Sequence, residues 1–427
     1  SDNAANNIEA VAVSANAHGA ISVRELAAQN HIPILSDQPF FKELAIGGAA
    51  RVSDYSTTGS VTSYEGDLRW RPVEGLLFRG SYQRAVRAPN IGELFSPPSG
   101  TQVAFGTPPA SLGDPCDVRS SARTGANGAS VRALCLAQGV PNAVIDTYTF
   151  PTTATGGTIR GNLGLTPETA NTYNVGFILN PHLGSALLRD ISLSVDYYNI
   201  KISNVISAVP GLTVLSKCYN LDGSNPTYSV ANSFCQALTR DAQGQLTDVA
   251  QPFLNLGGLR TDGIEIQFNW AVHLSDIGVG DGNSQVYLNS AVGWTNHYEI
   301  QTLPGSAFQD FAGTSTIGRA LPTWKALTTF GYRSDTWGMG LRWRYQGGMK
   351  DVSSVTTPLN PAVGVSAYNL FDLFANMRIN DGFELRAGVT NLFDKGLQFV
   401  ASSQTNTDVA VYDAVGRSYY IGVKFAF

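Results

Sequence analysis

The sequence predicts an all-β protein, a transmembrane antiparallel β-barrel, from three observations. Long segments alternate between apolar and polar residues, the connections between them sort into short and long ones, and the last segment is apolar on one face. Strands that cross a bilayer need about 9–11 residues and alternate between a lipid face and a lumen face. The competing prediction is a soluble β-sandwich, whose strands also alternate but average about 5–6 residues.

Composition favours the membrane alternative. Of the 427 residues, 43% are hydrophobic and 14% are charged, against a usual charged fraction of about 25%. No apolar run approaches the roughly 18 residues of a transmembrane helix, so a closed barrel is the remaining way to satisfy the backbone in lipid. The net charge of -5 gives no support for a nucleic-acid partner. The polar residues at 1–7 do not resemble a signal peptide and suit a mature or truncated start.

Alternation defines thirteen candidate strands. In one of the clearest, Ile264, Ile266 and Phe268 alternate with Glu265 and Gln267. Most of the thirteen exceed the usual length of a globular strand. In chain order they are 24–34, 42–54, 60–72, 75–87, 168–180, 190–206, 264–272, 282–298, 324–333, 339–346, 367–380, 383–390 and 417–427.

The connections between these strands alternate in length. The odd-numbered ones are short, at 35–41, 72–74, 181–189, 273–281, 335–337 and 380–382. The even-numbered ones are longer, at 55–59, 88–167, 207–252, 299–320, 352–366 and about 400–416. Short periplasmic turns and long outer loops are typical of outer-membrane barrels, whereas a soluble sandwich has no reason to sort its loops in this way.

The odd number of strands has a consequence for the start of the chain. Bacterial single-chain barrels have an even number of strands with both ends in the periplasm. We therefore expect 1–20 to be an outer-loop segment and 21–427 to be the C-terminal part of a larger barrel, with long extracellular loops at 88–167 and 207–252. A further strand within 8–20 would restore an even number, but the Ala-, Ser- and Asn-rich sequence there favours a loop.

Four motifs resemble those of TonB-dependent outer-membrane receptors. In 79–95 a strand leads into Arg-Ala-Pro and then an acidic residue before Leu-Phe, and 162–176 contains Leu-Thr-Pro-Glu-Thr, which resembles the segment that restarts the barrel in that family. The stretch 391–395, Asn-Leu-Phe-Asp-Lys, follows the penultimate strand. The C-terminal spacing also resembles the signal read by the barrel-assembly machinery, and its residues are Tyr420, Gly422, Phe425 and Phe427.

The resemblance implies a barrel of about 22 strands with a plug in its lumen, of which this chain holds about 13. The plug domain and the peptide that contacts TonB are not found in the sequence. The expected partners are therefore outer-membrane lipid, the missing N-terminal plug and barrel strands from the same gene product or a companion chain, and TonB through that missing part. A surface protein is a further candidate partner. The expected location is the outer membrane of a Gram-negative bacterium.

The resemblance implies a receptor that imports a scarce, bulky nutrient such as a ferric siderophore, cobalamin or a saccharide, with no enzymatic activity. The alternative is a passive porin, or a structural or adhesive surface barrel that anchors a partner. The long loops 88–167 and 207–252 favour a vestibule that encloses a ligand over an open pore.

The four cysteines form two local pairs, Cys116 with Cys135 and Cys218 with Cys235, one pair in each of the two longest loops. Disulfides persist at an oxidising cell surface. A Cys₄ metal site is the competing prediction, but the sequence has no Cys-x-x-Cys spacing. We therefore expect two disulfides, each stabilising its loop by about 3 kcal/mol.

Candidate ligand-binding residues lie where a strand passes into the largest loop: Arg84, Arg87, Asn90 and Glu93. Turn formation and packing explain these residues equally well. The many inward-facing charges, among them Glu265, Lys325 and Arg344, are typical of a hydrated barrel wall, which is the more economical interpretation for most of them. The five histidines have no paired spacing, and no nucleophile–base motif or phosphate-binding loop is present, so we expect no cofactor, metal site or catalytic residue.

Overall fold

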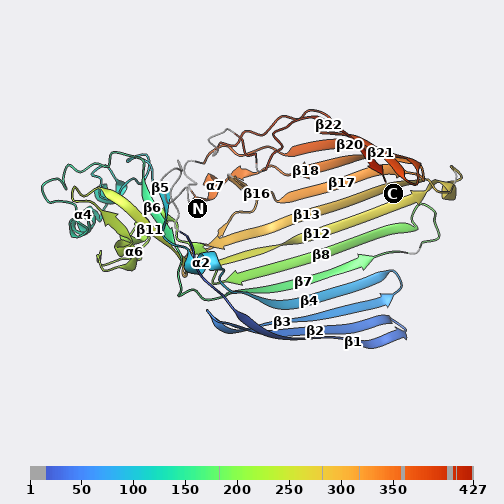
Figure 1. The fold of residues 1–427 in the computed structure, drawn as a ribbon, viewed down its shortest axis with the longest axis horizontal. Helices are drawn as coiled ribbons and strands as arrows, with labels where there is room; N and C mark the ends of the chain where they lie inside the picture. The colour runs from blue at the N-terminus through green and yellow to red at the C-terminus, as the bar shows by residue number, and fades with distance from the viewer. Residues whose placement is uncertain are drawn as a thin grey trace.

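The computed structural model describes residues 16–425 except 182, 281, 317, 357–360, 402–406 and 410. Its dominant feature is one large sheet, the barrel sheet, whose 13 strands follow one another in chain order (Figure 1). Each strand pairs antiparallel with the next. These strands are β1 (Val23–Gln38), β2 (Phe41–Tyr55), β3 (Gly59–Val73), β4 (Leu76–Arg87), β7 (Glu168–Leu179), β8 (Asp190–Ser203), β12 (Gly258–His273), β13 (Gln285–Gln301), β17 (Trp324–Arg333), β18 (Trp337–Gln346), β20 (Tyr368–Asn380), β21 (Phe383–Thr390) and β22 (Ser418–Phe425).

All thirteen strands expected from alternation are confirmed, with boundaries that differ by a few residues. The largest difference is at β12, which begins at Gly258 rather than at 264. Arg260 and Asp262 are polar residues on the face that carries Ile264 and Ile266, so the apolar alternation stops before the strand does. Among the described residues, no helix is long and apolar enough to cross a membrane.

The barrel sheet has an apolar outer face and a polar inner face, as its period of two requires. Large apolar side chains remain exposed on the outer face, including Val175 at 62%, Phe330 at 53% and Ile421 at 81%. On the inner face Glu43 lies opposite Arg71, and Arg342 lies opposite Asp372. An apolar exterior with charges on the inner side is typical of a wall between lipid and a hydrated lumen.

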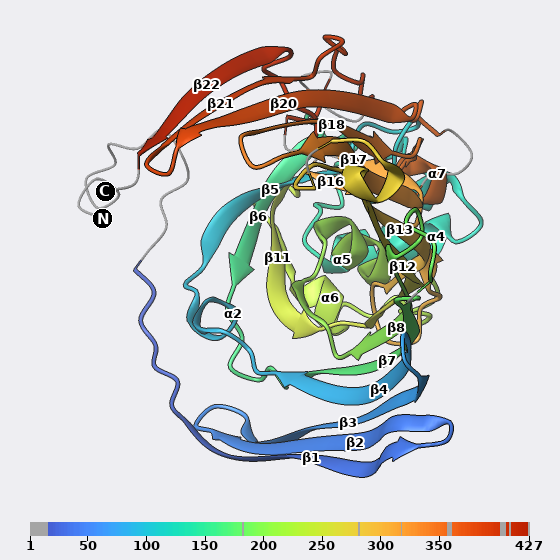
Figure 2. The ribbon, with the colours of Figure 1, turned by 90° about the vertical axis from the view of Figure 1, so that its right-hand side faces the viewer.

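Seen along its strands, the barrel sheet is a curved wall that does not close on itself (Figure 2). The edge strands are β1 and β22, and within the described residues they do not pair with each other. In this antiparallel order β1 is the first strand and β22 the thirteenth. The two edge strands therefore run in the same direction, from the end with long loops to the end with short turns (Figure 1).

The two longest loops fold together into one structure, the loop unit, formed by 91–160 and 206–255. It contains a five-stranded sheet in which β6 pairs in parallel with β11 and so joins the two loops. Its strands are β5 (Ser99–Ala104), β6 (Ala154–Arg160), β9 (Ile206–Ala208), β10 (Leu238–Arg240) and β11 (Leu246–Asn255). Its helices are α2 (Ile91–Phe95), α3 (Ser121–Thr124), α4 (Gly128–Ala137), α5 (Gly211–Cys218) and α6 (Ser233–Gln236).

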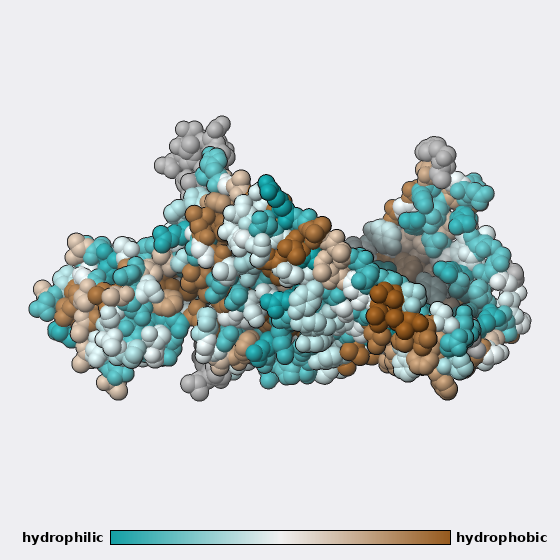
Figure 3. Space-filling model, turned by 90° about the horizontal axis from the view of Figure 1, so that it is seen from below, coloured by the Kyte–Doolittle hydropathy of each residue, from teal (hydrophilic) through white to brown (hydrophobic). Residues whose placement is uncertain are grey.

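The loop unit has its own hydrophobic core, which includes Leu134, Ile145, Leu215 and Val249, each at most 1% exposed. It extends beyond one end of the barrel sheet and, in the view along the strands, lies across the space that the sheet surrounds (Figures 1 and 2). Seen from the side of β1, the largest hydrophobic patches lie over the barrel sheet rather than over the loop unit at the left (Figure 3).

The remaining elements are short. The 3-10 helix η1 (Leu274–Ile277) follows β12, and β14 (Gln309–Asp310) pairs with β13. A small three-stranded sheet and a helical turn lie at the loop end, and they are β15 (Thr314–Thr316), β16 (Arg319–Leu321), β19 (Lys350–Asp351) and α7 (Ser353–Thr356).

Candidate functional site

Many charges on the inner face of the barrel sheet are paired with one another. Arg79 lies 2.6 Å from Asp196 on β8, and Arg344 lies 2.9 Å from Asp372 on β20. Arg386 likewise contacts Glu384 at 3.1 Å. These side chains are partly exposed, so their function is to neutralise a hydrated wall rather than to add much stability. The interpretation of the inward charges as a self-paired wall therefore holds for these residues.

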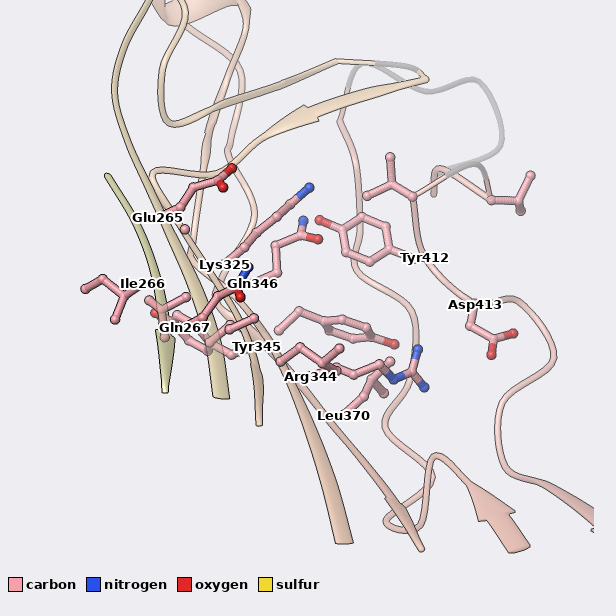
Figure 4. A pocket seen from close by; sticks show the side chains of 18 residues that line it. Glu265, Ile266, Gln267, Lys325, Arg344, Tyr345, Gln346, Leu370, Tyr412 and Asp413 are labelled. Atoms are coloured by element: carbon pink, nitrogen blue, oxygen red, sulfur yellow. The ribbon is translucent and has the colours of Figure 1, made fainter. Parts of the chain in front are cut away.

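One cavity of about 660 Å³ lies on the inner face, between β12, β13, β17, β18 and β20 and the loop that precedes β22. Glu265 and Lys325 project into it from the strands, and Tyr412 faces them from the loop, whereas Ile266 points away (Figure 4). In the described part of the chain, neither Glu265 nor Lys325 has an opposite charge within 4.0 Å. In this they differ from Arg344, which lines the same cavity and is paired with Asp372.

Three polar atoms that border this cavity are buried without a hydrogen-bond partner among the described residues: the hydroxyls of Tyr368 and Tyr412 and Nε2 of Gln346. The two tyrosine rings meet edge to face at 5.1 Å, and both residues are buried. Burial, followed by the nearby carboxylate of Asp408, raises the pKa of Tyr412, so this hydroxyl stays protonated and can donate a hydrogen bond. Buried polar groups without partners carry a free-energy cost that a polar ligand or water would relieve.

The cavity is thus lined by three charged residues that have no opposite charge within 4.0 Å among the described residues, Glu265, Asp413 and Lys325, and by orphaned hydrogen-bonding groups. This chemistry suits a polar ligand or polar polypeptide. No group of three or more His, Cys, Asp and Glu residues within the described ranges could hold a metal ion. Sequence reasoning placed Glu265 and Lys325 on the inner face but missed Tyr368 and Tyr412, because the loop that carries Tyr412 has no periodicity to read.

Three of the four candidate ligand residues lie together at the root of the loop unit. Asn90 and Glu93 form a capping box at the start of α2, with bonds of 2.8 and 2.9 Å. Arg87 donates to Glu93 at 3.0 Å and to Glu168 at 2.7 Å. Glu168 also accepts from the backbone N–H of Ile206 at 2.7 Å. We call these residues the root clasp, because they fix the strands β4, β7 and β8 where the two loops leave the sheet.

The root clasp joins two of the segments that carry the family resemblance. The backbone N–H of Asn162 donates to the carbonyl of Glu93 at 2.9 Å, and Leu94 and Leu165 pack with Ile206 in a small hydrophobic cluster. These contacts explain the motif residues as turn and packing groups. Contact of Arg87, Asn90 or Glu93 with a ligand stays a prediction.

Arg84 does not join this group. In the strand register it lies opposite Tyr64 and Asn171, on the outer face of the barrel sheet, while Arg87 lies opposite Glu168 on the inner face. The side chains at 84 and 87 differ by three positions, and an odd separation places them on opposite faces of a strand. Arg84 and Arg87 are close in sequence, but the pleat of β4 places their side chains on opposite faces of the sheet.

Both expected disulfides are present in the loop unit, Cys116–Cys135 and Cys218–Cys235. Between them lies a buried polar centre in which Arg240 donates to both carboxylate oxygens of Asp114 at 2.7 Å. Arg240 also donates to the hydroxyl of Tyr219 at 3.0 Å. Burial raises the pKa of Tyr219 to about 12. The carboxylate of Asp114, the hydroxyl of Tyr219 and the two terminal nitrogens of Arg240 all have partners, and among the described residues only Nε of Arg240 is left without one. The centre therefore organises the loop unit rather than offering an open site.

The residues of the assembly signal lie on the last strand. Tyr420 lies opposite Gly388 on the inner face, and an added Cβ at Gly388 would lie 2.5 Å from the Tyr420 ring. Phe425 is 61% exposed and lies on the outer face, while Gly422 has open space beside it. Phe427 lies outside the described residues. Recognition of these four residues by the assembly machinery stays a prediction.

Comparison with known proteins gives one family and one fold. The family model described as "TonB dependent receptor-like, beta-barrel" matches residues 3–392. No curated protein sequence matches the chain.

Solved structures with a similar fold include two siderophore receptors and an iron transporter. A mutant of the ferric enterobactin receptor PfeA from Pseudomonas aeruginosa is 15% identical with a TM-score of 0.58, and the match covers 95% of this chain and 45% of that one. The siderophore receptor PirA from Acinetobacter baumannii is 14% identical with a TM-score of 0.55, covering 95% and 46%. The FrpB iron transporter from Neisseria meningitidis is 13% identical with a TM-score of 0.52, covering 95% and 46%. The chain spans about half the length of these proteins, and at such identities the likeness shows the fold alone.

Proposed function

This chain belongs to the TonB-dependent receptor-like β-barrel family, and from that premise we propose that it is part of an outer-membrane receptor that imports a scarce, bulky nutrient. The family consists of outer-membrane receptors and transporters rather than enzymes. Within that frame, the cavity beside Lys325 and Tyr412 is the observation that carries the proposal, since it offers unpaired charges and orphaned donors on the lumen side of the wall.

The loop unit supports uptake of a captured ligand over free diffusion. It is a folded body with its own core, and it lies across the loop end of the barrel sheet (Figure 2). In a passive pore such a folded body would obstruct diffusion, whereas in a receptor it can form a vestibule that holds the ligand before transport. An adhesive barrel could use the loop unit as well, but it would leave the polar cavity unexplained.

We propose that the complete barrel includes further strands beside β1 and β22, a plug within the lumen, and a segment that contacts TonB. The open edges of the described sheet support this, because unpaired backbone groups in lipid cost several kcal/mol each. The proposed location is the outer membrane of a Gram-negative bacterium, with the loop unit at the cell surface. The N-terminal residues 1–20 are proposed to form an outer-loop segment.

For the substrate we favour a ferric siderophore over cobalamin or a saccharide. The similar folds named above belong to receptors for ferric enterobactin, siderophores or iron. The cavity supports a ligand with several hydrogen-bonding groups, since Tyr368, Tyr412 and Gln346 each have an atom without a partner among the described residues.

Uptake by cells tests this function. Cells that carry the full-length receptor as their sole uptake route should accumulate iron from a labelled ferric siderophore, and a protonophore should abolish accumulation. Uptake that resists the protonophore would favour a passive pore, and no uptake of any of the three nutrient classes would favour the adhesive alternative.

The cavity itself is tested by Lys325→Gln. Loss of one charge-assisted hydrogen bond should weaken ligand binding by about tenfold or more. Lys424→Gln is the matched control, because Lys424 lies on the same face at the short-turn end, beside Asp381 and Arg378. Equal affinity of both variants would remove the cavity from the proposal.

A further inference from the structure

Three cations form a row on the outer face of the barrel sheet, near its loop end. In the strand register Arg84 on β4 lies opposite Asn171 on β7, Asn171 lies opposite Lys201 on β8, and Lys201 lies opposite Arg260 on β12. All three basic side chains are exposed. With about 4.8 Å between neighbouring strands, the row extends over about 14 Å. We call Arg84, Lys201 and Arg260 the outer basic row.

Tyrosines place this row relative to the membrane. Tyr82 lies two positions from Arg84 on the same face, and Tyr173 and Tyr197 lie on that face of the next two strands, two and four positions from the row. The ring centroids of Tyr82 and Tyr173 lie 4.8 Å apart, with the two rings tilted by 35°. Outward-facing tyrosines gather where the membrane meets water. Since a strand rises about 3.3 Å per residue, the basic row lies roughly one headgroup layer above the apolar surface.

The cations of the row differ from several arginines of the inner face in their charge partners. Within the described ranges, no carboxylate lies within 4.0 Å of Arg84, Lys201 or Arg260, although arginines such as Arg79 and Arg344 are paired on the opposite face. Arg260 stacks on Phe308 at 3.8 Å, which holds its guanidinium in place. Glu299 lies opposite Arg260 in the register and marks the end of the row.

We propose that the outer basic row binds phosphate-bearing headgroups of the lipid that surrounds the barrel in the outer leaflet. Exposed guanidinium and ammonium groups without carboxylate partners are complementary to phosphate monoesters, and arginine binds phosphate oxygens in a bidentate manner. Basic residues just outside the apolar zone are attracted to anionic lipid headgroups. The row lies on the face that contacts lipid, so the source of the phosphate is membrane lipid rather than a free ion. This inference rests on the proposed membrane location and adds a lipid partner to it.

The test measures lipid retained by the full-length receptor. The parent protein is purified in a neutral detergent, exposed to diphosphoryl lipid A or to phosphatidylethanolamine, and examined by native mass spectrometry. We expect a preference for diphosphoryl lipid A, and a loss of about tenfold or more in its retention by the triple variant Arg84→Gln, Lys201→Gln, Arg260→Gln.

The matched control removes three cations at the short-turn end, with Lys42→Gln, Arg189→Gln and Arg378→Gln, and should retain lipid A like the parent. Heat-modifiable migration on gels reports whether each variant is folded, so failure of the barrel itself is seen separately from loss of lipid binding. Equal retention by the folded triple variant and its control would overturn the proposal. Displacement of the lipid by millimolar inorganic phosphate would overturn the lipid source, and a parent without preference between the two lipids would overturn the proposal even if the triple variant does not fold.

Discussion

Asp114 and Arg240 form the most deeply buried ion pair among the described residues, with side-chain exposures of 0% and 2%. Removing one partner of such a pair leaves an uncompensated charge in the interior, which typically costs about 3–5 kcal/mol. We therefore expect Asp114→Asn to destabilise the loop unit by about that amount. Faster proteolysis within 88–167 and 207–252 of the folded receptor would show it.

Two further variants separate charge burial from loss of a contact. Arg132→Gln breaks a pair in which Arg132 is 36% and Asp146 65% exposed, while Asp146 keeps its contact with Arg123 at 3.5 Å. This variant should leave proteolysis of the loop unit nearly unchanged. The double variant Asp114→Leu, Arg240→Met removes both buried charges and should recover part of the lost stability. If the double variant is less stable than Asp114→Asn, the buried charge is not the cause.

Tyr219 gives the loop unit a dependence on alkaline pH. Burial raises its pKa to about 12, above the usual value of about 10. A group with a raised pKa stabilises the fold fully below its unfolded pKa, and that contribution is lost as pH rises from about 10 through about 12. Two units correspond to about 3 kcal/mol. The loop unit should become protease-sensitive over this window, and Tyr219→Phe, which cannot ionise, should lose much less resistance between pH 10 and 12.

At the scale of elements, glycine–aromatic pairs help to set the strand register. On the inner face Tyr420 lies over Gly388 on the neighbouring strand, and Tyr287 lies over Gly331 in the same way. An added Cβ at Gly388 would lie 2.5 Å from the Tyr420 ring, so Gly388→Ala should force the ring away and weaken the pairing of β21 with β22. Overpacking of this kind costs about 1–3 kcal/mol.

The urea midpoint of the receptor in detergent measures this effect. Gly293→Ala is the control, because an added Cβ there meets nothing within 4 Å. The control should be neutral or slightly stabilising, since alanine restricts the unfolded chain more than glycine does. Equal midpoints for the two variants would show that the Tyr420–Gly388 contact does not support the edge of the sheet.

The stability of the loop unit depends on its two disulfides. Cys116 and Cys135 are fully buried and connect the start of the unit to α4. Their replacement by alanine should destabilise the unit by about 3 kcal/mol, from the chain entropy of a loop of this size. Trypsin should then cut 88–167 while the barrel sheet stays resistant. Peptide mapping of the parent without reductant should find Cys116–Cys135 and Cys218–Cys235, and crossed linkages would contradict the structure.

The sequence revealed the barrel sheet and left the loop unit unseen, for a physical reason. In each barrel strand, residues that face lipid alternate with residues that face the lumen, so apolar and polar residues alternate along the sequence. Strands such as β6 and β11 lie within the loop unit rather than between lipid and lumen, so their residues carry no such period. Their parallel pairing joins segments more than 80 residues apart and has no local signal.

At the scale of the whole molecule, the site could be predicted only in part. Alternation placed Glu265, Lys325 and Arg344 on the inner face, because face follows from parity. It could not reveal that Arg344 is neutralised by Asp372 while Lys325 is unpaired, since that depends on register across strands. Grouping by nearness in sequence failed for Arg84, which faces away from Arg87.

The two edges of the barrel sheet lead to the last prediction. Since β1 and β22 run in the same direction, direct closure would require a parallel pair in a sheet whose other neighbours are antiparallel. An unpaired edge in lipid is also excluded, because each unsatisfied backbone group there costs several kcal/mol. We therefore expect another strand of the receptor to lie beside each edge.

Cysteines introduced by Leu26→Cys and Ile421→Cys, near the loop ends of β1 and β22, should not form a disulfide in the folded full-length protein. Leu26→Cys with Val52→Cys, which lie opposite each other in the register of β1 and β2, is the positive control. A disulfide between positions 26 and 421 as complete as that of the control would show that the thirteen strands close on themselves, and the proposed larger barrel with its plug would then be wrong.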